Sequence, residues 1–420
     1  MMTQAFYTGV SGIRTHQTAI DITSNNLANV NTVGYREYGS EFASLFEREL
    51  HTNAQSSSVQ SSIGVGSRVQ ASAMNLSAGA YTLTERSTDL AIMGEGWFGV
   101  TDGEGTLYTR AGGFYFDVNN DLVTNDGYHV LGTTAGNIEG DTLTRVTNEV
   151  ALGDIQEQVP LRFPDTLTIA PVATTQTSFM ANLGVEDVAR KVSTQIVTPE
   201  GERNNLELSF TRSAVQTPPN TGWEVTASIK SLDGESVYAT QSGIVEFDER
   251  GALVATTLGS IDNGGVAVEI DLGSGFEGIV ATSGVVNGGS SVANGMIGGE
   301  LVGYEINTNA EVIATFTNGM QSSVGKVAVF HFQNDQGLER VGTTSFRPTS
   351  NSGEALFYKD ANGNNILGAQ VKNYQLENSN VKIETALTEL IIYQRAFDAN
   401  SKSITTADEM IQKALNMSAR

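Results

Sequence analysis

The sequence predicts an α+β protein of several domains, in which long helices at both chain ends flank nested, mainly β domains. Three observations predict this class. The chain has 420 residues, more than one ordinary hydrophobic core organises. Helical periodicity is strongest at the two ends. The chain as a whole is rich in Gly, with 45 residues, and poor in Pro, with 7, and short β-type segments recur between turn residues in its middle part.

Residues at both ends follow the 4,3,4,3 spacing of one helix face. A helix from about 381 to 417 would extend roughly 55 Å at ~1.5 Å per residue, so it needs a partner along its length. The mixed apolar and polar stripe predicts a paired, coiled-coil-like layer of the two helices; the alternative is two ordinary amphipathic helices that close a core. The stripe positions are Phe6, Val10, Ile13, Gln17, Ile20, Ser24 and Leu27, and then Ile383, Leu387, Leu390, Gln394, Phe397, Ser401, Ile404, Asp408, Ile411 and Leu415.

The sequence between the helices predicts a nested layout. Residues 51–62, "HTNAQSSSVQSS", have no apolar period and indicate a connection. Residues of hairpin type occur at Asn119-Asn120, Asp126-Gly127 and Gln336-Gly337. The predicted domains are a terminal helical domain (1–30 with 380–420), a connecting layer (31–74 with 365–379), an inner β-domain (75–167 with 311–364) and an inserted outer β-domain (168–310).

Composition excludes several function classes. The formal net charge of −23 repels phosphate backbones and anionic lipid, so we expect no nucleic-acid partner. The apolar runs are far shorter than a membrane span, so we expect no membrane insertion. The N-terminus lacks the pattern of a cleaved signal peptide, so any export would use another route. With no cysteine, disulfides and thiol chemistry are excluded.

Two motifs resemble binding loops but lack the required context. Gly94-Glu95-Gly96-Trp97-Phe98-Gly99 matches a dinucleotide fingerprint, yet β-type residues follow where a helix should begin. The stretch from Asp360 to Asn365 resembles the start of a calcium loop, but its sixth residue is not Gly and its twelfth, Val371, is not Glu.

The sequence therefore predicts no catalytic, cofactor-binding or metal-binding residue and no cofactor, and the protein is predicted not to be an enzyme. The four histidines are scattered without ligand spacing, and no nucleophile or phosphate-binding motif occurs. A secreted β-rich enzyme or a carbohydrate-binding module is the competing class.

The stretch "NNLANVNTVGYR", residues 25–36, follows the N-terminal helical pattern. Asn and Gly tolerate left-handed backbone and bind free backbone groups, so this composition ends a helix.

Five segments together resemble the bacterial flagellar rod and hook family over nearly the whole chain. They are "SGIRTHQTAIDITSNNLANVNTVGYR", "TDLAIMGEGWFGV", "FDVNNDLVTNDGYHVLG", "GLERVGTTSFRPTSNSG" and "LENSNVKIETALTELIIYQRAFDANSKSITTADEMIQKAL". The large central insertion is typical of the hook members, whereas rod members are shorter. The alternative is a distal-rod or hook-like paralogue of the basal body.

The resemblance implies a structural subunit that forms a flexible extracellular tube and transmits torque from rod to filament as a universal joint. Implied partners are further copies of the chain, rod, hook-cap and hook–filament junction proteins, and the flagellar type III export apparatus. The implied location is the flagellar hook or basal body, reached without a cleaved signal peptide.

Three groups of residues are expected to matter for assembly. The apolar stripe members are the expected helix contacts: Phe6, Val10, Ile13, Ile20, Leu27, Ile383, Leu387, Leu390, Phe397, Ile404, Ile411 and Leu415. The resemblance makes Asn25, Asn26, Asn29, Gly34 and Tyr35 a family joint, with Tyr35 an anchor against the returning C-terminal segment. Its C-terminal counterpart contains Gln394, Arg395, Asn400 and Asp408.

Overall fold

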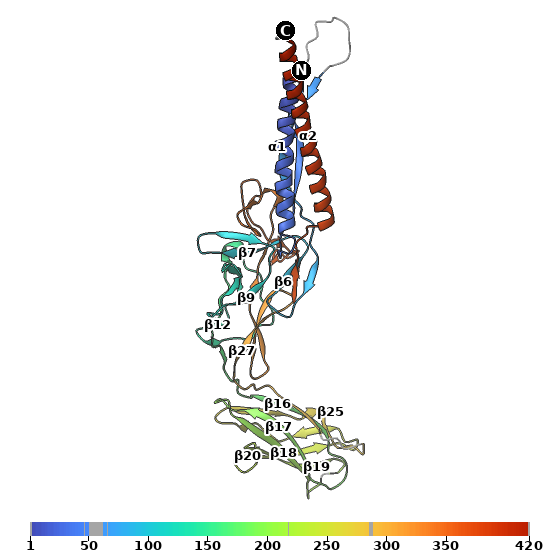
Figure 1. Ribbon diagram of the computed structural model, residues 1–420. Helices are drawn as coiled ribbons and strands as arrows, with labels where there is room; N and C mark the ends of the chain where they lie inside the picture. The colour runs from blue at the N-terminus through green and yellow to red at the C-terminus, as the bar shows by residue number, and fades with distance from the viewer. Residues whose placement is uncertain are drawn as a thin grey trace.

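The molecule is elongated, with its helices at one end and its sheets stacked away from them (Figure 1). The computed structural model describes residues 2–45, 47–49, 62–64, 66–216, 218–284 and 289–418. Both chain ends lie at the helical end, a β body occupies the middle, and the strands β16 to β20 lie in a second β region at the far end.

Two helices account for the chain ends, as the periodicity predicts. Helix α1 spans Met2–Ala28 and helix α2 spans Ile383–Ser418. They run side by side and in opposite directions (Figure 1). Neither is apolar enough over a sufficient length to cross a membrane, within the residues that are described.

A long antiparallel hairpin lies along α1. Strands β1 (Tyr38–Ser44) and β4 (Ser67–Met74) pair over their whole length. The short strands β2 (Glu47–Glu49) and β3 (Ser62–Gly64) pair further along the same two segments. Of the predicted connection at 51–62, residues 51–61 lie outside the described part of the chain.

The β body contains a sheet of 15 strands built from early and late parts of the chain. Its main path joins β12 (Ile138–Glu139), β13 (Thr142–Leu143), β15 (Thr168–Ile169), β27 (Gly299–Ile306), β28 (Glu311–Phe316), β29 (Gln321–Val327), β11 (His129–Thr134), β7 (Trp97–Thr101), β8 (Thr106–Thr109), β32 (Ser345–Arg347) and β31 (Glu339–Arg340). Attached to it are β9 (Phe114–Phe116), β10 (Leu122–Thr124), β14 (Val159–Pro160) and β30 (Val329–Phe330).

Three two-stranded pairs complete the β body. Two of them join strands that precede the sheet to strands that lead into α2: β5 (Tyr81–Leu83) with β36 (Gln375–Glu377), and β6 (Leu90–Met93) with β35 (Gln370–Asn373). The third is β33 (Tyr358–Lys359) with β34 (Asn365–Ile366). Because early strands pair with late ones, the middle of the chain is inserted between them.

The sheet of the β body is covered on both faces, because successive residues of a strand point to opposite sides. On β7, Phe98 and Val100 enter one apolar cluster while Trp97 enters another. On β8, Leu107 enters the cluster of Phe98 and Val100, and Tyr108 enters the cluster of Trp97. The cluster around Trp97 also contains Met74, at the end of β4, and so joins the hairpin to the body.

Two further sheets at the far end enclose a core of their own. Buried and partly exposed residues alternate along the middle strands of the second sheet, which gives each strand one core-facing side. The first sheet contains β16 (Gln176–Asn182), β22 (Ile261–Asp262), β23 (Ala267–Asp271), β24 (Gly273–Ser274), β25 (Glu277–Val280) and β26 (Ser290–Ala293). The second contains β17 (Arg190–Val197), β18 (Arg203–Arg212), β19 (Thr221–Lys230), β20 (Val237–Phe247) and β21 (Leu253–Thr256).

The sheets refine several predictions from the sequence. Strands β15 and β27, at the two ends of the expected 168–310 insertion, belong to the body's sheet. The turns at Asn119-Asn120 and Asp126-Gly127 connect paired strands, as predicted. The prediction of a hairpin turn at Gln336-Gly337 is wrong. These residues lie in a 3-10 helix, Asp335–Gly337, and the flanking strands β30 and β31 pair with other strands and not with each other.

The two β regions should unfold separately, since each has its own core. We expect Phe210→Ala, at a side chain with 0% exposure in the far core, to cost about 3–5 kcal/mol there. The chain has 2 tryptophans, Trp223 in that core and Trp97 in the body. Urea unfolding followed by fluorescence should show a lower midpoint for Trp223, in a Trp97→Phe background, and an unchanged midpoint for Trp97, in a Trp223→Phe background.

The matched control is Tyr238→Ala, at an exposed position of the same sheet, which should move neither midpoint appreciably. Equal shifts at both tryptophans in Phe210→Ala would contradict separate unfolding.

Candidate assembly site: the terminal helices and the joint below them

The two helices approach each other closely through small residues of α1. A Cβ atom at Gly9 would lie 2.7 Å from Cγ1 of Ile404, and one at Gly12 would lie 2.6 Å from Oδ1 of Asn400. Real Cβ atoms do not approach so closely, so a larger residue at either position would force the Ile404 or Asn400 side chain to move. Further along, Ala19 has 0% exposure. The contact within one subunit therefore depends on small side chains.

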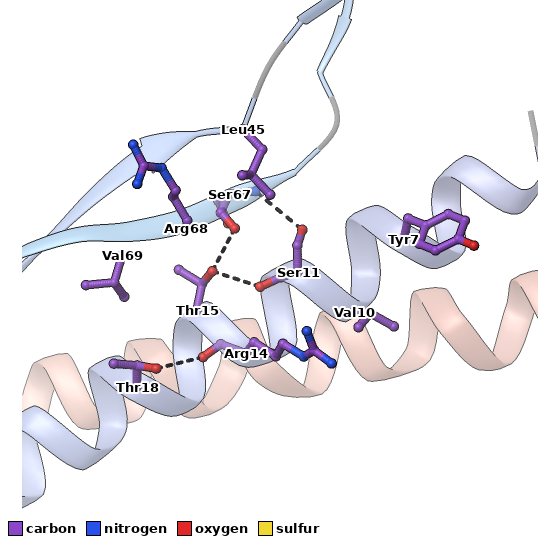
Figure 2. A pocket seen from close by; sticks show the side chains of 10 residues that line it. All are labelled: Tyr7, Val10, Ser11, Arg14, Thr15, Thr18, Leu45, Ser67, Arg68 and Val69. Carbon is purple, nitrogen blue, oxygen red and sulfur yellow. Dashed lines mark hydrogen bonds between the residues drawn. The ribbon is translucent and has the colours of Figure 1, made fainter.

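The hairpin covers another side of α1 (Figure 2). The Thr15 hydroxyl donates to the Ser67 carbonyl over 2.9 Å, and the Ser11 hydroxyl accepts from the Ser67 amide over 3.4 Å. Next to this contact, the centre of the His16 ring lies 5.9 Å from the centre of the Phe42 ring on β1 and 6.3 Å from that of the Tyr393 ring on α2. Burial lowers the pKa of His16, so the neutral ring is favoured where the three elements meet.

The predicted apolar contacts of the helices are incompletely covered in the single subunit. Four are exposed: Phe6, Ile383, Leu387 and Leu415. The other eight are half-buried: Val10, Ile13, Ile20, Leu27, Leu390, Phe397, Ile404 and Ile411.

The predicted C-terminal signature residues do not form one cluster. Asn400 lies against Gly12 and donates from its side chain to the Ala396 carbonyl. Gln394, Arg395 and Asp408 are exposed.

Below the helices, the stretch "NNLANVNTVGYR" makes a compact hydrogen-bonded turn. The Asn26 side chain, buried at the end of α1, accepts from the Tyr35 hydroxyl and the Tyr38 amide, each over 3.1 Å, and donates to the Tyr38 carbonyl over 2.8 Å. Asn25 is exposed and accepts from the side chain of Asn29. One amide side chain thus fixes the path of the chain as it leaves the helix.

Gly34 is required at this turn for two reasons. Its φ of +71° lies in the left-handed region, which favours glycine. A Cβ atom there would lie 2.3 Å from the Ala111 amide nitrogen. The Gly34 amide donates to the Glu377 carbonyl over 2.7 Å, which places the turn directly on strand β36.

Tyr35 is buried, with 1% exposure, and contacts the start of the returning segment. It forms a small apolar cluster with Val381 and Ala386, and Val30 packs against it. The Arg340 guanidinium lies 5.0 Å from the centre of the Tyr35 ring, within cation–π distance.

A buried charge cluster joins the same turn to the β body. The carboxylate of Glu377 lies 2.9 Å from Nη2 of Arg36 and 3.3 Å from Nη1 of Arg110, and all three side chains are at most 5% exposed. The Gly79 amide also donates to this carboxylate over 2.9 Å. Arg36 donates further to the Ser77 carbonyl. One carboxylate therefore holds three separate segments together.

The two guanidiniums depend on that carboxylate. Burial is the main cause that lowers the pKa of Arg110, and the neighbouring charge of Arg36 lowers it further. The surroundings of Arg110 therefore disfavour its charged form. Arg110 also donates to the Gly94 carbonyl over 2.7 Å. Without Glu377, two cations would remain in a site with little access to water.

Asn380 completes the joint, immediately before α2. Its side-chain oxygen accepts from the Glu37 amide over 2.7 Å, a contact between residues 343 apart in the chain. Its side-chain nitrogen donates to the carbonyls of Asn75 and Ser77 over 2.9 Å each. The start of α2 is thereby fixed to the N-terminal turn.

Four residues that make these long-range contacts were not predicted from the sequence: Arg36, Arg110, Glu377 and Asn380. Their positions in the sequence could have pointed to three of them, because Arg36 directly follows Tyr35 and because Glu377 and Asn380 lie shortly before α2. Which charge meets which could not be read from one sequence.

The motifs that resemble binding loops have structural roles. The Gly94–Gly99 stretch forms the turn between β6 and β7 and continues as strand. Asp360 accepts from the amides of Asn362 and Asn364, each over 2.8 Å, which closes the turn between β33 and β34. Across the described residues, no group of three or more His, Asp or Glu side chains is placed to hold a metal ion.

Comparison with known proteins agrees with this architecture. Three family models match: "Flagella basal body rod protein" at residues 6–36, "Flagellar hook protein FlgE/F/G D1 domain" at 91–170, and "Flagellar basal body rod FlgEFG protein C-terminal" at 373–417. In these three segments the chain is similar to the flagellar rod and hook family. The matches cover the turn with Tyr35, the body's sheet and helix α2.

Individual relatives extend the similarity over the whole chain. The flagellar hook protein FlgE of Borreliella burgdorferi is 27% identical over 99% of this chain and 100% of its own length. That of Salmonella typhimurium is 27% identical over 98% of this chain and 100% of its own length. These relatives support a structural subunit of the flagellar hook.

A crystal structure of the Helicobacter pylori flagellar hook protein FlgE2 shares the fold. It has a TM-score of 0.53 and 16% identity, and it covers 71% of this chain and 100% of that chain.

The joint should lose much of its stability when the Glu377 charge is removed. We expect Glu377→Gln to lower the free energy of unfolding of the β body by about 3–5 kcal/mol, because both guanidiniums lose their counter-charge. Urea unfolding followed by Trp97 fluorescence measures this. Glu85→Gln, at an exposed carboxylate near β5, is the matched control and should change stability by less than about 0.5 kcal/mol. Equal stability of the two variants would show that the cluster is dispensable.

Proposed function

We propose that this chain polymerises into the tube of the flagellar hook, outside the cell, through its terminal helices. The observation that carries the proposal is the contrast between closed β cores and uncovered helices. Leu387, Ile391 and Ile392 of α2 are 44%, 56% and 56% exposed. Burial of apolar surface contributes about 25 cal/mol per Å², so neighbouring subunits would gain free energy by covering these side chains.

The proposed arrangement places the helices of all subunits in a paired, coiled-coil-like inner layer. The elongated molecule (Figure 1) then extends from the helices through the connecting hairpin and the β body to the two-sheet region. We propose that this last region is the outer domain, and that it spans about 176–293, from β16 to β26, within the predicted 168–310; the sheet pairings of β15 and β27 with the body support this. Full-length similarity to hook proteins favours the hook over a distal-rod paralogue.

Bending under torque requires contacts that hold a subunit in the tube and yet exchange. The apolar anchors Leu390, Phe397 and Ile404 would hold the inner layer. Exposed polar residues beside them, Gln394 and Asp408, leave contacts that water can replace. The joint around Glu377 would keep each helix pair fixed to its own β body, so that force on the tube reaches the outer domain.

The proposal includes the partners of such a tube. The terminal helices would contact rod, hook-cap and hook–filament junction proteins at the ends of the polymer, and the subunit would leave the cell through the flagellar type III export apparatus without a cleaved signal peptide. Immunogold labelling of isolated basal bodies tests the location: gold on the curved hook supports the proposal, and gold confined to a straight rod contradicts it.

Phe397→Asp should abolish polymerisation and leave the β regions folded, since it places a charge in the half-buried helix contact. Negative-stain microscopy of purified protein after salting-out measures tubes, and tryptophan fluorescence monitors both cores. The control is Glu409→Gln at an exposed position of the same helix, which should still form tubes. Normal hooks on cells that carry only Phe397→Asp would refute this role.

Tyr35 should matter for stiffness more than for assembly itself. Tyr35→Ser removes the ring that contacts Val381 and Ala386, so we expect hooks with a lower bending stiffness, measured from shape fluctuations of isolated hooks. Tyr35→Phe keeps the ring, loses only the hydroxyl that donates to Asn26, and should have a smaller effect. Hooks of wild-type stiffness with Tyr35→Ser would contradict the anchor role.

A further inference from the structure

A groove of about 550 Å³ runs between α1 and the β1–β4 hairpin (Figure 2). Its floor is closed by the hydrogen bonds of Ser11 and Thr15 to Ser67. Its remaining walls include the apolar side chains Tyr7, Val10, Leu45 and Val69 and the cations Arg14 and Arg68.

The described side chains supply no counter-charge for the cations of the groove. Arg14 and Arg68 are exposed, and neither forms an ion pair with any side chain that the structure describes. The chain has only 24 basic residues against 47 acidic ones. Two unpaired guanidiniums beside an apolar surface therefore fit an occupant that is both acidic and apolar.

Helix α2 carries a surface of that composition, which we call the acidic stripe: Glu384, Leu387, Ile391, Gln394 and Asp398. Their 3,4,3,4 spacing places them on one face, and all five are exposed. Neither carboxylate forms an ion pair with a described side chain. On α1, the groove residues Tyr7, Val10 and Arg14 have the matching 3,4 spacing.

The acidic stripe cannot occupy the groove of its own subunit. Asn400 of α2 contacts Gly12 of α1, and Ile391 lies nine residues before it. At 3.6 residues per turn, that separation is about 180° around the helix. The stripe therefore points away from its own α1, and only another molecule can bring it to a groove.

We infer that the groove of one subunit receives the acidic stripe of a second copy of the chain, so that α2 of one subunit lies between α1 and the hairpin of its neighbour. This inference rests on the proposed function and specifies which faces meet. The apolar centre of the stripe would cover Tyr7 and Val10. Arg14 and Arg68 would bind the two carboxylates, which favours the correct register over contacts between like charges.

A charge-exchange experiment on the full chain tests the inference. One variant carries Arg14→Glu with Arg68→Glu, another Glu384→Arg with Asp398→Arg, and a third combines all four changes. The control for the groove variant, Arg203→Glu with Arg250→Glu, makes the same net charge change as that variant at exposed positions of the far β region. Sedimentation after salting-out gives the critical concentration for polymerisation, and Trp97 and Trp223 fluorescence verifies folding.

We expect the groove variant and the stripe variant each to raise the critical concentration at least about tenfold, equivalent to 1.4 kcal/mol, and the combined variant to restore most of the loss. A groove variant that assembles like the control overturns the inference. So does a folded combined variant that fails as badly as its parents, because the two faces then do not meet. If the wild-type chain forms no tubes, the proposed function itself fails.

Discussion

The carboxylate of Glu377, held between Arg36 and Arg110, is the interaction on which the rest of the architecture depends. The chain leaves α1, builds every sheet, and must then return to the point from which it left. A buried charge without a partner is costly. The three side chains therefore favour the arrangement of their segments in which both guanidiniums meet the carboxylate. That arrangement places β36 beside the turn with Gly34, and α2 then begins against Tyr35. The helix pair is thereby tied to the β body and not only to itself.

The helix contact within the subunit and the contact proposed between subunits use different faces of the helices. Gly9 and Gly12 let α2 approach α1 closely, so a single subunit needs few large side chains for its own helix contact. The large apolar residues, such as Leu387 and Ile391, remain uncovered. In the proposed polymer, neighbouring subunits would cover these side chains. The same division explains why the β cores are closed while the helices are not.

Sequence patterns predicted the parts of this fold that depend on local periodicity. The helices, the hairpin turns at Asn119-Asn120 and Asp126-Gly127, and the β character between the ends follow from spacing and turn chemistry. The turn at Gln336-Gly337 was predicted wrongly, because Gly next to a polar residue fits a 3-10 turn as well as a hairpin. The pairing of β15 and β27 with the body's sheet escaped prediction because strand partners far apart in sequence leave no local pattern.

The candidate site divides in the same way. The sequence by itself determined that a helix ends near residues 25–36, that the helical stripes are mixed, and that no known catalytic or metal motif is complete, since each depends on residue types at short spacing. Only the tertiary structure decided that Glu377 meets Arg36 and Arg110, that the Asn380 side chain binds the Glu37 amide, and that Arg14 and Arg68 share a groove whose described walls carry no carboxylate. These contacts join residues up to 343 positions apart, and a partner's identity across such a distance is set by how the whole chain packs.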